Sequence, residues 1–295
     1  FALEQGVDAI SQSFVNSAED IRAVRSAAAS LGYSPFVIAK IERSTALDHL
    51  EEIIEAADGI MIARGDLGVE VPIETIPVIQ KRLMLAANRK GKPVITATQM
   101  LESMTHNSRP TRAEATDVAN AILDGTDCVM LSGESAMGSY PVESVAMLAK
   151  IATSIEPNRP MLKVRDLFAE DEAKGHIRPA HLIALSVETC LEYTRPAAVF
   201  VPTRSGSTAR RIAQFRLPVW IIAVSSREAT CQRLQFSSGV WPVLQSDHPD
   251  DWNAYIKKWI ADRSIAGDIV ILTEGPSSKH PDANHRMEII DLTQN

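Results

Sequence analysis

Residues 36–68 read FVIAKIERSTALDHLEEIIEAADGIMIARGDLG, and the fold class can be predicted from this segment. Two short apolar runs, 36–41 and 59–63, flank a segment that Ser44 opens and that carries apolar residues at helical spacing. Continuous apolar runs of this length are typical of strands that are buried on both faces. The order strand, helix, strand therefore predicts two parallel strands joined by a right-handed crossover.

The same alternation continues on both sides of this unit. Ser17 and Ser44 are suited to be helix N-caps, and Thr111 with Glu114 forms a capping box for a helix that ends near Gly125. The pattern predicts five parallel strands, at residues 7–15, 36–41, 59–63, 93–97 and 127–131. The fold class is therefore α/β, with about five β/α units of a (β/α)8 TIM barrel, followed by a smaller α/β sheet domain.

The pattern is interrupted at residues 154–165, where two prolines stand among polar residues. We predict a partial barrel domain at 1–156, a linker at 157–174 and an α/β domain at 175–295. In the second domain we expect a helix at 179–193 and strands at 197–201, 219–224, 240–244, 269–272 and, more weakly, 287–292.

Aromatic residues gather in one segment of the second domain. Trp252, Tyr255, Ile256 and Trp259 are spaced as one face of a helix. We expect this face to pack against the sheet rather than to form an aromatic binding box.

Composition excludes several classes of protein. Hydrophobic residues make up 45% and charged residues 23%, so the chain is neither disordered nor collagen-like. A net charge of −7 and a pI of about 5.6 argue against nucleic acid as a partner. The three cysteines lack a C-x-x-C pair, which argues against a disulfide framework or a zinc site. The sequence contains no apolar run long enough for a membrane span or signal peptide, and we expect a cytoplasmic protein.

The sequence begins with Phe1 rather than Met, and residues 1–15 have the pattern of a helix end running into a strand. A closed barrel uses eight strands, whereas five are predicted here. We therefore expect a fragment whose open sheet edges make it marginally stable or prone to associate. On that expectation, the chain alone turns over little or no substrate.

Charged residues follow the apolar runs of two neighbouring predicted strands. Lys40 and Glu42 stand two residues apart, so their side chains point to the same face of the strand. Asp66 follows the next strand, and adjacent strands lie about 4.8 Å apart, so we expect the carboxylates of Glu42 and Asp66 to reach one cation. Two carboxylates, completed by substrate oxygens and water, are a usual way to hold Mg²⁺ at phosphoryl-transfer sites.

Polar residues also follow the next two predicted strands: Thr98 after one, and Ser132 and Glu134 after the other. Function gathers at such strand ends in (β/α) barrels. Lys40 and Glu42 have an alternative interpretation as a structural ion pair, although stability alone rarely explains the cost of desolvating two charges there. Taken by itself, Thr98 is more typical of a cap or turn, so its candidate role depends on its charged neighbours.

Five motifs, taken in this order and spacing, resemble the pyruvate kinase family. They are IAKIE at 38–42, MIARGDLGVE at 61–70, PVITATQMLESM at 93–104, RPTRAEATDVANAILDGTDCVMLSGESA at 109–136 and TRSGSTARRIA at 203–213. The resemblance extends over about residues 1–224. It implies transfer of a phosphoryl group from phosphoenolpyruvate to ADP, which gives pyruvate and ATP in glycolysis.

The resemblance also implies a role for each residue at the strand ends. Lys40 would stabilise charge as the phosphoryl group moves, and Glu42 and Asp66 would bind a divalent metal, Mg²⁺ or Mn²⁺. Lys40, Gly65, Asp66 and Thr98 would contact phosphoenolpyruvate, with Thr98 near its methylene carbon and in the proton path. These roles suit the chemistry, because loss of the phosphoryl group leaves an enolate that needs cations at its oxygen.

A turn in the second domain combines hydroxyl groups, a glycine and the start of a helix, which suits a phosphate. Its residues are Thr203, Arg204, Ser205, Gly206, Ser207 and Thr208. The alternative is a plain helix N-cap. By the resemblance this loop holds the phosphate of an effector, commonly fructose 1,6-bisphosphate. Residues 274–280 depart from the glycine- and threonine-rich effector loop of the family, so the identity of a sugar-phosphate effector stays open.

The resemblance further implies a homotetramer and dependence on K⁺, whose ligands, like the nucleotide-binding residues for ADP and ATP, are not in this chain. Two other functions remain open. A metal-dependent lyase or aldolase would also use carboxylates to hold a pyruvate enolate, but Lys40 and the appended domain count against it. The chain could instead be a phosphate-ligand sensor or an assembly module.

Overall fold

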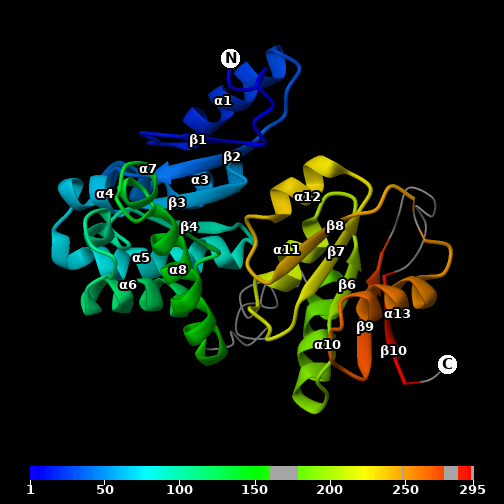
Figure 1. The fold of residues 1–295 in the computed structure, drawn as a ribbon. Coiled ribbons are helices and arrows are strands. Elements are labelled where there is room, and N and C mark those ends of the chain that lie inside the picture. The colour runs from blue at the N-terminus through cyan, green and yellow to red at the C-terminus, as the bar shows by residue number, and fades with distance from the viewer. Residues whose placement is uncertain (160–178, 248, 276–284, 294–295) are drawn as a thin grey trace. The chain divides into compact units, whose positions relative to one another are not determined.

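The computed structural model describes residues 1–159, 179–247, 249–275 and 285–293 (Figure 1). The chain divides into two compact units, Phe1–Pro160 and Met161–Asn295. Most of the linker expected at 157–174 lies outside the described residues, so its structure stays a prediction. Within the described parts, each helix is too short or too polar to cross a membrane.

Unit 1 is built on a five-stranded parallel sheet in the order β1-β2-β3-β4-β5. The strands are β1 (Ala9–Gln12), β2 (Phe36–Ile41), β3 (Gly59–Ala63), β4 (Val94–Ala97) and β5 (Cys128–Met130). The sheet order follows the chain, as the colour sequence in Figure 1 shows. This arrangement confirms the predicted α/β class with part of a (β/α) barrel. The first and last strands are shorter than predicted, and each pairs on one side only within the described sheet.

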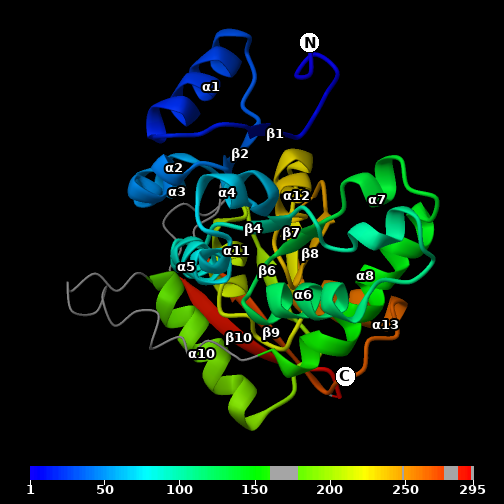
Figure 2. The same ribbon diagram turned by 90° about the vertical axis from the view of Figure 1, so that its left-hand side faces the viewer.

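Helices connect these strands. They are α1 (Ala18–Ser30), α2 (Ser44–Asp48), α3 (Leu50–Ala56), α4 (Arg64–Glu70), α5 (Ile76–Arg89), α6 (Arg112–Leu123), α7 (Gly133–Ala136) and α8 (Pro141–Ile155), with 3-10 turns η1 (Ile73–Thr75), η2 (Glu102–Thr105) and η3 (Glu156–Asn158). Ser17 is the N-cap of α1, and Thr111 with Glu114 forms the capping box of α6, as the sequence predicted; Ser17 also forms a capping box, with Asp20. The single helix expected after Ser44 is instead two helices, because the backbone of His49 leaves the helical region at φ −108° and ψ 17°. Helices α6 and α8 pack together, as Figure 2 shows.

The two faces of β2 have different surroundings. Val37, Ala39 and Ile41 belong to a buried cluster with side chains from α1, α3, α5 and α6. Because side chains alternate along a strand, Lys40 lies on the opposite face. The helices therefore cover one side of the sheet, and the charged residue at the end of β2 is left on the other.

Unit 2 contains a mixed sheet in the order β10-β9-β6-β7-β8. Its strands are β6 (Val199–Pro202), β7 (Ile221–Ser225), β8 (Val240–Leu244) and β9 (Ile269–Glu274), which run parallel, and β10 (Arg286–Asp291), which is antiparallel to β9. Its helices are α10 (Pro179–Tyr193), α11 (Ser207–Ala213), α12 (Glu228–Leu234) and α13 (Trp252–Asp262). Trp252, Ile256 and Trp259 of α13 are buried against the sheet, which confirms their predicted packing role.

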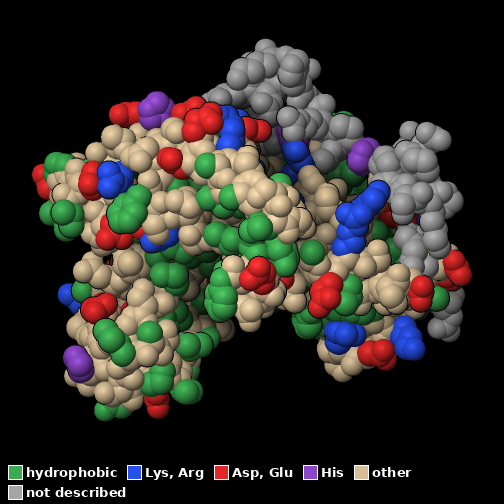
Figure 3. All heavy atoms as spheres, turned by 90° about the horizontal axis from the view of Figure 1, so that it is seen from above, with side chains coloured by type: hydrophobic (Ala, Val, Ile, Leu, Met, Phe, Trp, Pro, Cys, Tyr) green, Lys and Arg blue, Asp and Glu red, His purple; other side chains and the backbone are tan. Residues whose placement is uncertain are grey.

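Some large hydrophobic side chains lie at the surface of unit 1, among them Val69, Ile73 and Val142. Figure 3 shows that hydrophobic, acidic and basic side chains are interspersed on the face that it draws. The contrast between buried and exposed residues of one type allows a direct test of the core.

We expect Ile62→Ala to lower the free energy of unfolding by about 2–5 kcal/mol, because the side chain of Ile62 is fully buried in β3 and its removal leaves a cavity. The same change at Ile73, which is 75% exposed, should alter the free energy by less than about 0.5 kcal/mol. Urea denaturation followed by far-ultraviolet circular dichroism measures both. Equal effects would contradict the assignment of Ile62 to the core.

Candidate active site at the strand ends of unit 1

Lys40 and Glu42 form an ion pair at the carboxyl end of β2. The side chain of Glu42 is only 2% exposed, whereas that of Lys40 is 24% exposed. The second carboxylate oxygen of Glu42 accepts a hydrogen bond of 2.8 Å from the backbone N–H of Phe14, and Lys40 Nζ donates to Ser13 Oγ at 3.1 Å. The pair thus ties the end of β2 to the loop after β1, while part of the Lys40 side chain stays open to solvent.

Gly65, Asp66 and Thr98 lie at the ends of the next two strands. The N–H of Gly65 donates to Thr98 Oγ1 at 2.9 Å, and that hydroxyl donates to the carbonyl of Ala97 at 2.7 Å. A Cβ atom on Gly65 would lie 3.4 Å from the Thr98 hydroxyl, at ordinary van der Waals contact. Asp66 is exposed in the first turn of α4.

The donor atoms present suit a hard divalent cation. Glu42 and Asp66 offer carboxylate oxygens from the ends of β2 and β3, which are neighbours in the sheet. Over the described residues, the structure shows no cluster of three or more His, Cys, Asp or Glu side chains arranged around a metal position. Mg²⁺ commonly uses one or two carboxylates and takes its other oxygens from substrate and water. Two carboxylates are therefore within the number that Mg²⁺ commonly takes from a protein.

The backbone at Thr98 is strained. Thr98 and Gln99 have φ angles of 67° and 53°, in the left-handed region that residues other than glycine rarely adopt. Each such residue costs on the order of 1–3 kcal/mol. Arg64 lies in the motif MIARGDLGVE but has no predicted role; it donates to the carbonyl of Thr98 at 2.8 Å. A charged residue directly after a fully buried strand must find polar partners, and this signal could have identified Arg64.

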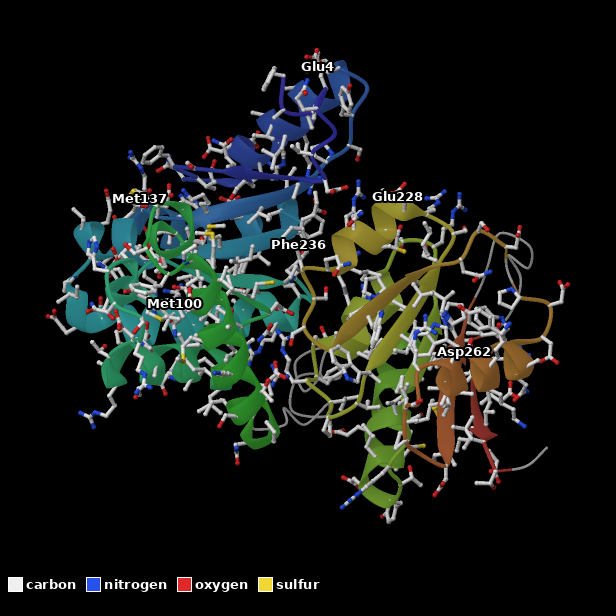
Figure 4. The ribbon with its side chains drawn as sticks, in the orientation of Figure 1. Glu4, Met100, Met137, Glu228, Phe236 and Asp262 are labelled. Carbon is white, nitrogen blue, oxygen red and sulfur yellow. The ribbon has the colours of Figure 1, made fainter. Side chains whose placement is uncertain are left out.

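Glu134 connects the ends of β4 and β5. It is fully buried, and its two oxygens accept hydrogen bonds from the backbone N–H groups of Leu101 at 3.0 Å and of Ser132 at 2.8 Å. Met100, next to Leu101, is also fully buried and is labelled within unit 1 in Figure 4. The sequence places Glu134 after a predicted strand but assigns it no catalytic or binding role.

Glu114 holds another loop at this end of the sheet. Its carboxylate accepts hydrogen bonds from the N–H and hydroxyl groups of both Ser103 and Thr111. Burial acts to raise the pKa of Glu114, but the hydrogen bonds from Ser103 and Thr111 outweigh it and lower the pKa below its ordinary value of 4.5. The ionised form is therefore the one that fits this loop.

The predicted phosphate loop of unit 2 precedes α11. Gly206 has a φ of 77° and donates its N–H to Thr203 Oγ1 at 2.9 Å. Thr230 of α12 donates to the carbonyl of Arg204 at 2.9 Å, which ties the loop to the neighbouring helix. The side chains of Arg204, Ser205 and Ser207 are exposed. Residues 276–280 of the second segment expected at the effector site lie outside the described residues.

The fold and the site define a class of protein: part of a (β/α) barrel with polar side chains at the carboxyl ends of its parallel strands, joined to a smaller α/β domain. Comparison with protein-family models narrows this class. Residues 1–145 match the model for the pyruvate kinase barrel domain, and residues 181–290 match the model for the pyruvate kinase alpha/beta domain. The chain belongs to the pyruvate kinase family.

Curated relatives agree with these matches. The chain is 48% identical over 278 residues to a pyruvate kinase of Thermococcus litoralis, an alignment that covers 93% of this chain and 58% of the relative. It is 43% identical over 279 residues to pyruvate kinase 2 of Synechocystis sp., with 93% and 46% covered. For a pyruvate kinase of Geobacillus stearothermophilus the identity is 46% over 250 residues, with 84% and 42% covered. The chain thus spans about half the length of the curated relatives it matches.

We expect Glu134→Gln to lower the free energy of unfolding by about 1–3 kcal/mol, because the amide nitrogen would face a backbone N–H and leave buried donors without an acceptor. Glu102→Gln is the matched control, since Glu102 is exposed in the same region. Urea titration measures both variants. A loss at Glu134 no larger than that at Glu102 would show that the bridge does not stabilise the fold.

The lowered pKa of Glu114 makes the stability depend on pH. Because the folded-state pKa is below the unfolded value, ionised Glu114 contributes stability above the ordinary value of 4.5, and this contribution is lost as the pH falls through the lowered folded-state pKa. We expect Glu114→Gln to be less stable than the wild type at pH 7 and the difference to shrink on acidification. Thermal unfolding from pH 7 downward measures this, with exposed Glu74→Gln as the control. A difference that is constant over this range would refute the linkage.

Proposed function

We propose that this chain forms the phosphoenolpyruvate- and metal-binding part of a pyruvate kinase, which transfers the phosphoryl group to ADP and gives pyruvate and ATP in glycolysis. The observation that carries this proposal is the Lys40–Glu42 pair at the end of β2. An ammonium group and a carboxylate at the rim of a parallel sheet supply both charges that phosphoryl transfer from an enol ester requires. Family membership and the names of the relatives support the same activity.

Lys40 is the cation that this chain itself contributes to the reaction. As the bond between phosphorus and the enol oxygen breaks, the phosphoryl group passes to an oxygen of ADP and negative charge develops on the enol oxygen. The ammonium group of Lys40, whose side chain is partly exposed, stabilises that charge. Glu42 holds Lys40 in place from the same strand face, and Ser13 holds it from the loop after β1.

Glu42 and Asp66 would hold the divalent cation, Mg²⁺ or Mn²⁺. When bound, it supplies positive charge to oxygens of the phosphoryl group and of the enolate. The carboxylate of Glu42 already has one oxygen fixed by the N–H of Phe14, so its orientation is set before a ligand arrives. Asp66 is exposed and free to approach a ligand from the neighbouring strand end.

Gly65 and Thr98 complete the substrate pocket in this proposal. The turn at Gly65 and Asp66 would meet the carboxylate of phosphoenolpyruvate through backbone N–H groups. Thr98 would take part in the proton path to the methylene carbon, through water, because an isolated hydroxyl is a poor acid. Its hydroxyl is held between Gly65 and Ala97, which keeps it at a defined point of the rim.

Further parts of the proposal concern the whole protein. Residues Thr203 to Thr208 would hold the phosphate of a sugar-phosphate effector, since the side chains of Arg204, Ser205 and Ser207 are exposed next to the start of α11. Exposed hydrophobic side chains on unit 1 are compatible with contacts in a homotetramer. A cytoplasmic location and dependence on K⁺ are proposed from the family alone.

Calorimetric titration of the chain with phosphoenolpyruvate in the presence of Mg²⁺ tests the central part of this proposal. We expect binding in the wild type and a loss of at least about tenfold in affinity, or ~1.4 kcal/mol, in Lys40→Met and in Glu42→Gln. Lys90→Met is the control, because Lys90 lies on the surface at the end of α5, where it pairs with exposed Glu51 and Glu55. Binding of a sugar phosphate without binding of phosphoenolpyruvate would instead favour the sensor interpretation. Unchanged affinity in both site variants would refute the assignment of the pocket.

A further inference from the structure

Arg64 is the first residue of α4 and follows β3 directly. Its side chain is only 10% exposed, and its guanidinium donates in two directions. On one side Nη1 donates to the carboxylate of Asp117 on α6 at 2.7 Å and to Gln80 on α5 at 3.4 Å. On the other side Nη2 donates to the carbonyl of Thr98 at 2.8 Å, and Nε points to that of Ala97 at 3.4 Å. The side chain therefore links two helices to the strained segment after β4.

An ion pair between Arg64 and Asp117 does not by itself require this geometry. Asp117 is 37% exposed and could pair with an arginine at the surface, where the desolvation cost is small. Instead the guanidinium is largely buried, and its planar group of N–H donors faces the successive carbonyl groups of Ala97 and Thr98. The loop that receives these bonds is the one in which Thr98 and Gln99 have positive φ angles.

The backbone of the next residue, Gly65, forms a hydrogen bond with the same threonine. Its N–H donates to Thr98 Oγ1 at 2.9 Å, while Arg64 donates to the carbonyl of Thr98. Two successive residues thus fix both the side chain and the main chain of Thr98. Since the hydroxyl also donates to the carbonyl of Ala97, it has little freedom to turn unless one of these partners moves.

We infer that Arg64 is a positioning residue that holds Thr98 in its strained conformation and so keeps the Thr98 hydroxyl at the substrate pocket, with Asp117 and Gln80 orienting the guanidinium. The importance of this arrangement for catalysis rests on the proposed function, in which Thr98 meets phosphoenolpyruvate. The mechanical part, that Arg64 fixes Thr98, stands on the contacts alone. Lysine cannot replace Arg64, because a single ammonium group cannot serve Asp117 and two carbonyl groups in one plane.

Amide hydrogen exchange at Gly65 tests the mechanical part directly. We expect Arg64→Lys to raise the exchange rate of the Gly65 N–H by at least about tenfold relative to that of Ile62 in β3, because release of the loop frees the Thr98 hydroxyl that this N–H binds. Asp117→Asn, which keeps Arg64 and its bonds to the carbonyl groups, should give a smaller increase. It also keeps the test decisive if Arg64→Lys does not fold.

The matched control is Arg25→Lys. Arg25 has the same kind of contacts, with Nε on the carbonyl of Ala56 at 3.0 Å and Nη2 on the carboxylate of Asp58 at 2.7 Å, but it lies on α1. This variant should leave the exchange of Gly65 unchanged. Unchanged exchange of Gly65 in both Arg64→Lys and Asp117→Asn would overturn the inference, whether or not the chain binds phosphoenolpyruvate.

A double-mutant cycle tests the link to the substrate. In calorimetry with phosphoenolpyruvate and Mg²⁺, Arg64→Lys and Thr98→Ala should each lower the affinity about tenfold, and the double variant should lose little more than either alone. Multiplying losses would show that Arg64 acts independently of Thr98 and would overturn the positioning role. Absence of binding in the wild type would refute the proposed function instead, and the exchange experiment would still decide the role of Arg64.

Discussion

The parallel pairing of β2, β3 and β4 is the constraint on which the candidate site depends. The register places Ile41 opposite Ile62 and Ala63 opposite Ala97. The three strands therefore end at the same edge of the sheet and at nearly the same level. Glu42, Arg64 and Thr98 directly follow these strands, so all three lie at that edge, and Arg64 and Thr98 are in contact there. A slip of one residue in either pairing would send every side chain of the strand to the opposite face. The backbone hydrogen bonds of the sheet therefore determine at which edge and at which level the residues of the candidate site lie.

Carboxylates at both ends of this sheet accept hydrogen bonds from backbone N–H groups, but with different consequences. At the amino ends, Asp58 accepts from Val37 at 2.9 Å and Asp127 accepts from Val94 at 2.9 Å, so each fixes the start of the neighbouring strand. At the carboxyl ends, Glu42 and Glu134 accept from loop residues that follow other strands. Bonds to strand starts fix the register, whereas bonds to loops fix the shape of the rim. In a barrel fold the first kind serves stability and the second kind shapes the surface where ligands bind.

The sequence predicted those features that depend on local patterns. The bounds of β2, β3, β8 and α10 agree with the prediction residue for residue, because each is a clear apolar or amphipathic run between turn or cap signals. The common face of Lys40 and Glu42 also follows from the period of a strand. The contacts that position the site could not be predicted, because Lys40 meets Ser13 across 27 residues and Arg64 meets Asp117 across 53. The break between α2 and α3 at His49 could not be predicted either, because no proline or glycine lies near it in the sequence.

Both loops proposed to bind phosphate-bearing ligands contain backbone with a positive φ angle, but they place it on different types of residue. In unit 2 the positive φ falls on Gly206, where a Cβ atom would lie 2.9 Å from the side chain of Leu234, so the local sequence agrees with the local structure. In unit 1 the positive φ falls on Thr98 and Gln99, two residues that disfavour it. A sequence that keeps a β-branched residue at such a position breaks its own local rule, and such breaks are expected where a side chain is needed for function. The hydroxyl of Thr98 is the group that glycine would remove, and it is the group that receives the N–H of Gly65. The strained backbone of Thr98 is therefore the energetic cost of keeping its hydroxyl oxygen at the rim of the sheet. The hydrogen bond from Arg64 is the interaction that holds the residue in that conformation.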